Sequence, residues 1–429
     1  MPESDFKLAL KAPIFSVVRY YVPDFVSEEF KNDPFVLLCC GGGSSKTGVP
    51  NYIIIARLLR NSEGKLDCEK WLEYSTDMEL HSQAVCSKDG KYIFTGTGAY
   101  CTILAVNKGK EEKKFELVEV LRTKTAIGED PNSTQSALIC NDEGTILATG
   151  SDEGNVLIWT FIQNTHNMAS DEQVKAAIRL NSTSHAHSKC VSCLAFHPSV
   201  EYLASTSRDG TASLINTSNG VVVQTIKLPS SFPKNTKISA CAFSDSITLL
   251  LLAVTKEGKA YLLRYYPFSY KHEVNWELKE TKRISKVDSS SLCLSDDGQY
   301  ICIGDINGDT SVFTTESFFT YTKPHHSHDL PTTALAYFPP IPSLELPNMK
   351  VSSYHYSGFI CSTSADYTLS LLPIKKNSIH IPMPSWKLIL FLLILLYIIY
   401  IITSNPQIIK MISSFCHIFY SLATGEVEL

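Results

Sequence analysis

One unit repeats along most of this chain: an apolar strand, a polar turn, a second strand, a turn of small residues and a third strand. The clearest copy is ALICNDEGTILATGSDEGNVLIWTF at 137–161. Val36 to Leu59 forms a divergent first copy. The other copies begin near Ala84, Val191, Ser239, Ser290 and Thr333. Strand units of this kind cannot bury their apolar faces alone, so a regular series of them predicts a ring of stacked sheets.

The repeat spacing predicts the kind of ring. The turn glycines of four copies are separated by 56, 48 and 50 residues: Gly154, Gly210, Gly258 and Gly308. That spacing is slightly longer than the ~40–45 residues of a WD-type blade. We therefore predict an all-β fold, a seven-bladed WD-type β-propeller over residues 1–378. The early strand Phe15 to Tyr21 is expected to complete the last blade and close the ring, which leaves only short, protected edges.

Two histidines fit the same scheme. His187 precedes Leu194 by seven residues, and His328 stands at the same distance before Leu335. A turn acid follows each histidine, Asp209 and Asp366 respectively. In WD-type blades such a histidine and aspartate hydrogen-bond within the blade and satisfy buried polar groups. These residues are therefore predicted to be structural.

A long apolar run follows the repeats. Leu388 to Ile409 contains no charged residue, and as a helix these 22 residues would span about 33 Å, against a hydrocarbon thickness of about 30 Å. Trp386 and Lys387 stand at its leading edge, as interfacial residues do. We predict one transmembrane helix at 388–409, after a stem at 379–387 and before a short lumenal tail at 410–429.

Flanking charge predicts the orientation of that helix. Lys375, Lys376 and Lys387 precede the run, whereas one lysine, Lys410, follows it. Positively charged flanks stay on the cytoplasmic side of a membrane. The propeller is therefore expected in the cytosol, with the C-terminus in the lumen.

Charge and cysteine usage argue against other classes of protein. The formal net charge is −5, whereas a DNA-binding domain usually carries a basic stripe that neutralises phosphates. A nucleic-acid partner is therefore not expected. The 13 cysteines show no paired spacing, which is typical of a reducing compartment rather than of a disulfide-linked secreted domain.

One loop departs from the repeat. The sequence CCGGGSSKTGVPN at 39–51 lies between the apolar runs FVLLCC and YIIIARLL. Its four glycines allow positive φ, so the backbone can turn carbonyls toward a cation or amides toward an anion. A phosphate-binding P-loop is not expected, because Ser45 stands where that pattern needs glycine and a strand, not a helix, follows. An ordinary glycine-rich hairpin stays an alternative.

At these residues the chain resembles a family. The segment GGGSSKTGVPN in the first blade, the seven repeats and the C-terminal anchor are similar to the COPII-pathway exchange factors of the endoplasmic reticulum, the prolactin regulatory element-binding protein family. The resemblance implies a guanine-nucleotide exchange factor for a Sar-type small GTPase. It would sit in the endoplasmic reticulum membrane as a single-pass protein and initiate COPII coat assembly. It implies no covalent chemistry and no organic cofactor.

The resemblance also implies site residues. Gly41, Gly42, Gly43, Gly48, Pro50 and Asn51 match the family's positions, whereas Ser44, Ser45, Lys46 and Thr47 lie where such loops vary. Backbone oxygens among residues 41–48 would hold a potassium ion. Val49 would be an apolar wedge against the GTPase and Asn51 a polar contact to it. An acidic residue before the second blade is also implied, for which Asp77 or Glu79 could serve.

Two other functions stay open. The chain could be a membrane-anchored scaffold that gathers protein partners without exchange activity. It could also be a DNA-binding transcriptional regulator, although the acidic balance and the predicted anchor argue against that function. We find no nucleophile, base and acid in a pattern that predicts a hydrolase.

Overall fold

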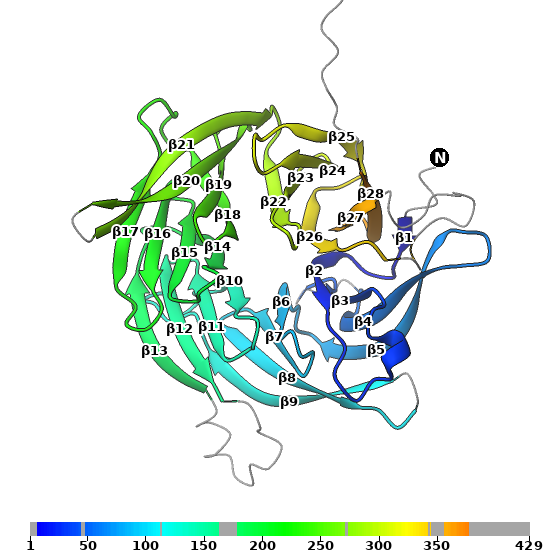
Figure 1. The fold of residues 1–429 in the computed structure, drawn as a ribbon. Coiled ribbons are helices and arrows are strands. Elements are labelled where there is room, and N and C mark those ends of the chain that lie inside the picture. The colour runs from blue at the N-terminus through cyan, green and yellow to red at the C-terminus, as the bar shows by residue number, and fades with distance from the viewer. Residues whose placement is uncertain are drawn as a thin grey trace, which may run out of the picture. The chain divides into compact units, whose positions relative to one another are not determined.

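Seven four-stranded antiparallel sheets make up the folded part of this chain. The structure is a computed structural model that describes residues 7–43, 48–111, 114–162, 178–270, 273–341, 344 and 356–376. Figure 1 shows the sheets arranged as blades around a central opening. The predicted all-β fold and the predicted count of seven blades are confirmed.

Each blade runs from an inner to an outer strand in the order of the chain, apart from the last. Blade 1 contains β2 (Ile14–Tyr20), β3 (Phe35–Cys40), β4 (Asn51–Arg60) and β5 (Leu66–Asp77), with the short 3-10 helix η2 (Glu28–Phe30) between β2 and β3. Blade 2 contains β6 (Gln83–Cys86), β7 (Tyr92–Thr97), β8 (Tyr100–Lys108) and β9 (Phe115–Lys124). Blade 3 contains β10 (Gln135–Cys140), β11 (Ile146–Ser151), β12 (Asn155–Phe161) and β13 (Ile178–His185).

The remaining blades follow the same plan. Blade 4 contains β14 (Val191–Phe196), β15 (Tyr202–Ser207), β16 (Thr211–Asn216) and β17 (Val222–Lys227). Blade 5 contains β18 (Lys237–Asp245), β19 (Thr248–Val254), β20 (Ala260–Tyr270) and β21 (Glu273–Ser285). Blade 6 contains β22 (Ser289–Leu294), β23 (Tyr300–Asp305), β24 (Asp309–Thr314) and β25 (Thr320–His326). Blade 7 contains β26 (Thr332–Phe338), β27 (Tyr356–Ser364), β28 (Thr368–Lys375) and β1 (Lys7–Ala9).

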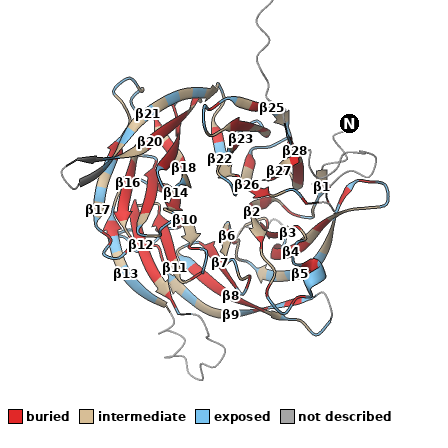
Figure 2. Cartoon of the chain, viewed as in Figure 1, coloured by how far each residue is buried: buried red, intermediate tan, exposed pale blue. Residues whose placement is uncertain are grey.

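The core lies between the faces of neighbouring blades. The second and third strands are covered on both faces, so they read as continuous apolar runs such as β3 (FVLLCC) and β19 (TLLLLAV), in which every residue is buried. Outer strands such as β9 alternate between buried and exposed residues, because one of their faces meets solvent. Figure 2 shows this difference as a change from buried second and third strands to more exposed outer strands.

The ring closes differently from the sequence-based expectation. The strand that completes the last blade is β1, whose Lys7 pairs with Ser370 of β28. The run Phe15 to Tyr21, predicted for that role, lies mostly in β2 and is the innermost strand of the first blade. The expectation was wrong because an apolar run predicts a strand but not its partner. The partner is set by the register of Tyr20 opposite Phe35.

The two predicted histidine–aspartate pairs are structural, with a threonine between the partners. His187 Nδ1 lies 2.9 Å from Thr211 Oγ1 and 3.7 Å from the Asp209 carboxylate. Thr211 in turn donates to Asp209 over 2.6 Å. The same arrangement joins His328 to Asp366 through Thr368 in blade 7 (His328 Nδ1 to Thr368 Oγ1, 2.7 Å). The direct histidine–aspartate hydrogen bond that we expected is therefore replaced by a bond through the threonine hydroxyl.

The predicted anchor cannot be compared with the fold. The stem, the helix predicted at 388–409 and the tail at 410–429 lie outside the described residues. Within the part of the chain that the structure does describe, no helix is long and apolar enough to cross a membrane.

Candidate functional site

The glycine loop connects β3 to β4 in the first blade. The strand register brings three segments to one end of this sheet: Ile14 pairs with Cys40, and Asn51 pairs with Asp77. The Gly41 amide also donates to the Pro13 carbonyl over 3.0 Å. The loop, the start of β2 and the end of β5 are therefore neighbours, although they are far apart in the sequence.

Asn51 ties these segments together with its side chain. Its Oδ1 accepts a hydrogen bond from the Gly43 amide (3.1 Å), and its Nδ2 donates to the Gly43 carbonyl (3.0 Å). The same Nδ2 donates to the Asp77 carbonyl, also over 3.0 Å. Asn51 is 2% exposed, whereas Gly43 is half-buried and Asp77 is exposed, so loss of its amide should cost about 0.5–1.5 kcal/mol for each hydrogen bond. Asn51 therefore closes the base of the loop.

Two glycine positions have physical reasons to be glycine. A Cβ on Gly41 would stand 2.0 Å from Asn51 Oδ1, so a larger residue would displace the amide that closes the loop. Gly43 has φ +87°, in the left-handed region that glycine adopts without strain. These requirements explain why the loop is rich in glycine at its described end.

Asp77 forms the other side of the site. Its backbone is left-handed (φ 52°), a conformation that aspartate tolerates better than most residues. The Ser75 hydroxyl donates to the Asp77 carboxylate over 3.2 Å, and the carboxylate is exposed to solvent. Asp77, one of the two acidic residues named from the resemblance, thus lies beside the loop, with its carbonyl bonded to Asn51 and its carboxylate exposed to solvent.

Glu79, the alternative acidic residue, is engaged elsewhere. Both oxygens of its carboxylate accept hydrogen bonds from Arg122 of β9, each over 2.8 Å. The Arg122 guanidinium lies 4.8 Å from the ring centre of Tyr100. The turn after Asp77 is therefore fixed to blade 2, and the site rests on two blades.

The exposed surface of the site is small and mixed. Gly48 and Pro50 are exposed, whereas Val49 is half-buried and packs against the apolar core between blades 1 and 7. Met78 is 55% exposed and directly follows Asp77. Sequence reasoning missed Met78, Arg122 and Tyr100, because their place beside the loop depends on the β4–β5 and β8–β9 registers. Ser44, Ser45, Lys46 and Thr47 lie outside the described residues.

The floor beneath the loop is uncharged. Burial raises the pKa of the Cys39 thiol to about 12, and burial is also the main cause that raises the pKa of Tyr52 to about 12. Both groups therefore stay protonated at neutral pH. Two carboxylates lie around this floor: Asp77 beside the Asn51 amide, and Glu73 close enough to act on Tyr52.

The described part of the site offers neutral carbonyl oxygens rather than charged metal ligands. The carbonyl oxygens of Gly43 and Asp77 converge on the Asn51 amide, and each carbonyl keeps a second lone pair. Neutral carbonyl oxygens are the donors that potassium sites use. Among the described residues, no group of three or more histidine, cysteine or acidic side chains could hold a metal ion.

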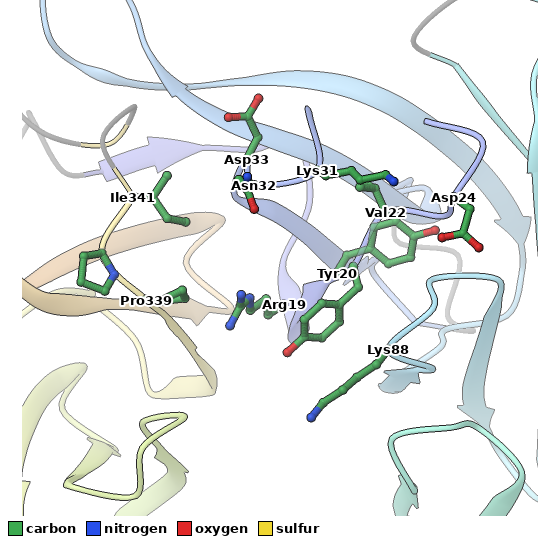
Figure 3. A pocket seen from close by; sticks show the side chains of 12 residues that line it. Arg19, Tyr20, Val22, Asp24, Lys31, Asn32, Asp33, Lys88, Pro339 and Ile341 are labelled. Carbon is green, nitrogen blue, oxygen red and sulfur yellow. The ribbon is translucent and has the colours of Figure 1, made fainter. Parts of the chain in front are cut away.

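A second candidate site lies at the other end of the blade 1 strands. A cavity of about 380 Å³ is lined by Arg19 and Asp24, by Lys88 and by Pro339 after β26 (Figure 3). Its charges are paired with residues outside it: Arg19 with Asp296 at 2.6 Å and Lys88 with Asp142 at 2.5 Å. The first pair joins blade 1 to blade 6 and the second joins blade 2 to blade 3, so the lining charges serve the ring more clearly than they serve a ligand.

Comparison with known proteins supports the fold. A profile of the WD domain, G-beta repeat, matches residues 179–216, from β13 to the end of β16. The chain is a seven-bladed WD-repeat propeller. Two crystal structures of Sqt1 from Chaetomium thermophilum have the same fold at 13% identity. One, bound to the N-terminus of the ribosomal protein L10, superposes with a TM-score of 0.56 over 85% of this chain and 97% of that one. The other has a TM-score of 0.57 over 87% and 99%.

A plant protein gives a more specific similarity. SEC12-like protein 1 of Arabidopsis thaliana is 29% identical over 129 residues. The match covers 29% of this chain and 30% of the plant protein, so the chain matches less than a third of that relative's length.

Proposed function

We propose that this propeller is a guanine-nucleotide exchange factor for a Sar-type small GTPase. In this proposal it acts from the endoplasmic reticulum membrane and starts COPII coat assembly for transport to the Golgi. The similarity to SEC12-like protein 1 supports the proposal in a general sense. The observation that carries it is the closed loop: a buried asparagine holds a glycine loop and an exposed acid together at one end of the first blade.

The proposed mechanism needs rigidity rather than covalent chemistry. An exchange factor binds the nucleotide-free GTPase more tightly than the loaded form, and by reciprocity it weakens nucleotide binding by the same factor. A loop fixed at Gly43 and Asp77 can press on a switch segment without yielding. Pro50, Met78 and the Asp77 carboxylate would make the contact, while Val49 would support the loop from its half-buried position.

Asn51 has a different part in this proposal from the one the resemblance implied. Its amide is buried and satisfied by Gly43 and Asp77, so we propose that it positions the loop. A direct contact between Asn51 and a GTPase stays a prediction, because it would require these hydrogen bonds to open.

Potassium would be held by the Gly43 and Asp77 carbonyls with further backbone oxygens of residues 41–48. When bound, the ion would supply positive charge that draws these oxygens together and stiffens the loop. Asn51 would hold the same carbonyls in place from the protein side.

Release of a fluorescent guanine nucleotide from a Sar-type GTPase tests the proposal. The full chain in liposomes should accelerate release over the spontaneous rate, more strongly in potassium than in sodium at equal ionic strength. No acceleration in either salt would refute the exchange function. Equal acceleration in both salts would leave the exchange function standing and refute the potassium site.

A protein scaffold is the second candidate. The solved Sqt1 complex has a propeller of this fold bound to a segment of another protein. A scaffold would bind the GTPase with the same affinity whether or not nucleotide is present, whereas an exchange factor must bind the empty GTPase more tightly.

A further inference from the structure

The turn that follows Asp77 is attached to the neighbouring blade. It leads from β5 of blade 1 to β6 of blade 2 and carries Met78 and Glu79. Both oxygens of the Glu79 carboxylate accept hydrogen bonds from the Arg122 guanidinium of β9, each over 2.8 Å. β5 and β9 are the outer strands of adjacent blades and lie side by side (Figure 1). The segment next to the glycine loop is therefore held from blade 2.

Arg122 joins Glu79 to a second residue of blade 2. Its Cζ lies 4.8 Å from the ring centre of Tyr100. Arg122 pairs with Thr102 across β8 and β9, and Tyr100 precedes Thr102 by two residues, so Tyr100 and Arg122 are diagonal neighbours on one face of the sheet. An arginine can stack on an aromatic ring and still present its donors to a carboxylate. One side chain thus holds Glu79 and Tyr100 together.

The turn that carries Met78 is closed by its own hydrogen bonds. The Glu79 amide donates to the Thr76 carbonyl over 3.0 Å, and the Thr76 hydroxyl donates to the Glu79 carbonyl over 2.7 Å. On the loop side, the carbonyl of Asp77 accepts the Asn51 amide over 3.0 Å. The backbone is therefore fixed on both sides of Met78, whose side chain is 55% exposed.

The Glu79–Arg122 pair is bidentate, which distinguishes it from an ordinary ion pair between blades. Lys237 and Asp288 join blade 5 to the loop before blade 6 through one nitrogen and one oxygen, 2.9 Å apart. A bidentate pair adds geometric specificity as well as energy, whereas a single exposed ion pair contributes little stability. The geometry of the Glu79–Arg122 pair is therefore that of a contact that orients the turn.

The side chains on either side of Arg122 are apolar and exposed. Met78 is 55% exposed and Tyr100 is 40% exposed. Val49, which the resemblance implied as the apolar wedge, is half-buried and packs against the core between blades 1 and 7. An apolar contact requires side chains that a partner can reach, and methionine and tyrosine are both enriched in the contact surfaces of protein complexes. Met78 and Tyr100 therefore meet this requirement better than Val49.

We propose that Arg122 is a positioning residue that sets Met78 and Tyr100 as one apolar contact beside the glycine loop, and that this contact enters an apolar hollow of the GTPase. The inference rests on the proposed exchange function and names the partner surface that the site takes. Met78 and Tyr100 touch the GTPase, whereas Arg122 and Glu79 act through them. Blade 2 thereby takes part in exchange, without any covalent step.

Release of a fluorescent nucleotide from a Sar-type GTPase, with the full chain in liposomes, tests the contact. Met78→Ala should lower the maximal rate by about fivefold to tenfold, because it removes an apolar side chain from the interface. Met78→Leu keeps the side-chain volume and should stay within about twofold of the wild type. Leu330→Ala is the matched control and should also stay within about twofold, since Leu330 is 46% exposed in the equivalent connection between blades 6 and 7.

A multiple variant tests whether Arg122 acts through the contact. Arg122→Ala should lower the rate by about threefold to fivefold in the wild type, but by less than about 1.5-fold in a chain that already carries Met78→Ala and Tyr100→Ala. An arginine that only stabilises the fold would give the same factor in both backgrounds. Lys237→Ala breaks an ion pair of similar exposure between blades 5 and 6 and should leave the rate within about twofold of the wild type.

Two results would overturn this inference while the exchange function stands: a Met78→Ala variant as fast as the wild type, or an Arg122→Ala effect that is equal in both backgrounds. A wild type that does not accelerate release would instead refute the proposed function, and this inference with it. A thermal melt of each variant checks folding.

Hydroxyl-radical footprinting of the unmutated chain gives an independent decision if a variant does not fold. The nucleotide-free GTPase should slow the oxidation of Met78 by at least about threefold, because the side chain becomes buried in the interface. Phe319 of blade 6 is 40% exposed and should oxidise at an unchanged rate. Equal oxidation of Met78 with and without the GTPase would overturn the inference.

Discussion

Blades 1 and 3 both have an asparagine at the start of the third strand, but its side chain has different partners in the two blades. Asn51 opens the third strand of blade 1, and Asn155 opens the third strand of blade 3. In blade 3 the Asn155 amide donates to the Ile127 carbonyl over 2.9 Å, and its oxygen lies 2.6 Å from His185 Nδ1. In blade 1 the equivalent amide holds Gly43 and Asp77 instead. The ordinary blade directs this side chain to its own outer strand, whereas blade 1 also directs it to a loop.

Other blades follow the pattern of blade 3. The first residue of the third strand contacts a histidine in each of them: Thr211 with His187, Asp309 with His326 and Thr368 with His328. The histidine lies on the outer strand in blades 3 and 6, and in the loop before the inner strand in blades 4 and 7. In blade 1 this position is Asn51, whose amide bonds to Gly43 of a longer loop and to Asp77, not to a histidine. A position that is structural in other blades can in this way support a binding surface.

The largest expected effect separates these two asparagines. Asn51→Ala removes three hydrogen bonds from the loop, and the loss of loop stability should lower exchange by about tenfold to a hundredfold, since 1.4 kcal/mol is a factor of ten. Nucleotide release from a Sar-type GTPase measures the change. A thermal melt of each variant checks that the propeller still folds.

Asn155→Ala is the matched control. Asn155 is also buried and also bonds a backbone carbonyl, so its loss should cost comparable stability but leave exchange within about twofold of wild type. Equal losses of exchange in both variants would mean that the loop in blade 1 is no different from an ordinary blade turn.

A second prediction concerns pH. The histidine that contacts the start of the third strand in blade 7, His328, can take up a proton, whereas Asn51 in blade 1 cannot. Burial lowers the pKa of His328 to about 4, against an ordinary value near 6.5. Between these values the unfolded chain binds more protons than the folded chain, so stability falls as the pH falls through this window. The His328 contribution should cost about 2 kcal/mol at pH 5 relative to pH 7.

Denaturant unfolding at several pH values measures this slope. His81 should add a similar slope, because burial lowers its pKa to about 4 as well. Burial also lowers the pKa of His187, so His328→Gln should remove a part of the slope and leave the rest. A His328→Gln variant whose stability varies with pH as steeply as the wild type would contradict the assignment.

The smallest predicted effect concerns the exposed acid of the loop. Asp77→Asn keeps the residue type that tolerates left-handed backbone and keeps the carbonyl that Asn51 holds. It removes the exposed charge alone, so exchange should fall by about threefold to tenfold, as for one exposed or half-exposed charge contact. Folding should be unchanged. An effect as large as that of Asn51→Ala would mean that exchange depends on the Asp77 carboxylate rather than on the hydrogen bonds of the Asn51 amide.

Much of the fold could be predicted from the sequence, because the repeat shows itself as strand periodicity and turn glycines. The seven blades and the structural histidines followed from local spacing. The closing strand did not, because β1 and β2 are both short apolar runs and their partners, β28 and β3, are chosen by register. The threonines between histidine and aspartate were missed for a similar reason, since their hydroxyls act across a turn.

Of the candidate site, the glycine loop and Asn51 could be predicted from the sequence, but the residues that surround them could not. The glycines and Asn51 stand out because they break the repeat, and Asp77 was named as one of two acids. What separates Asp77 from Glu79 is the pairing of Asn51 with Asp77 and the ion pair of Glu79 with Arg122. The first depends on the β4–β5 register within blade 1 and the second on a contact with blade 2, neither of which a single sequence displays.

The pairing of β1 (Lys7–Ala9) with β28 also determines when the ring can close during protein synthesis. Lys7 meets Ser370, so the first strand must wait for some 360 residues to be made before its partner exists. At about 5–20 residues per second that wait lasts roughly 20–70 s. For that time the unfinished ring exposes the apolar face of blade 1 that will pack against blade 7, and one face of each newest blade. A chaperone that shields nascent strands would therefore matter more for this chain than for one that closes within a single blade.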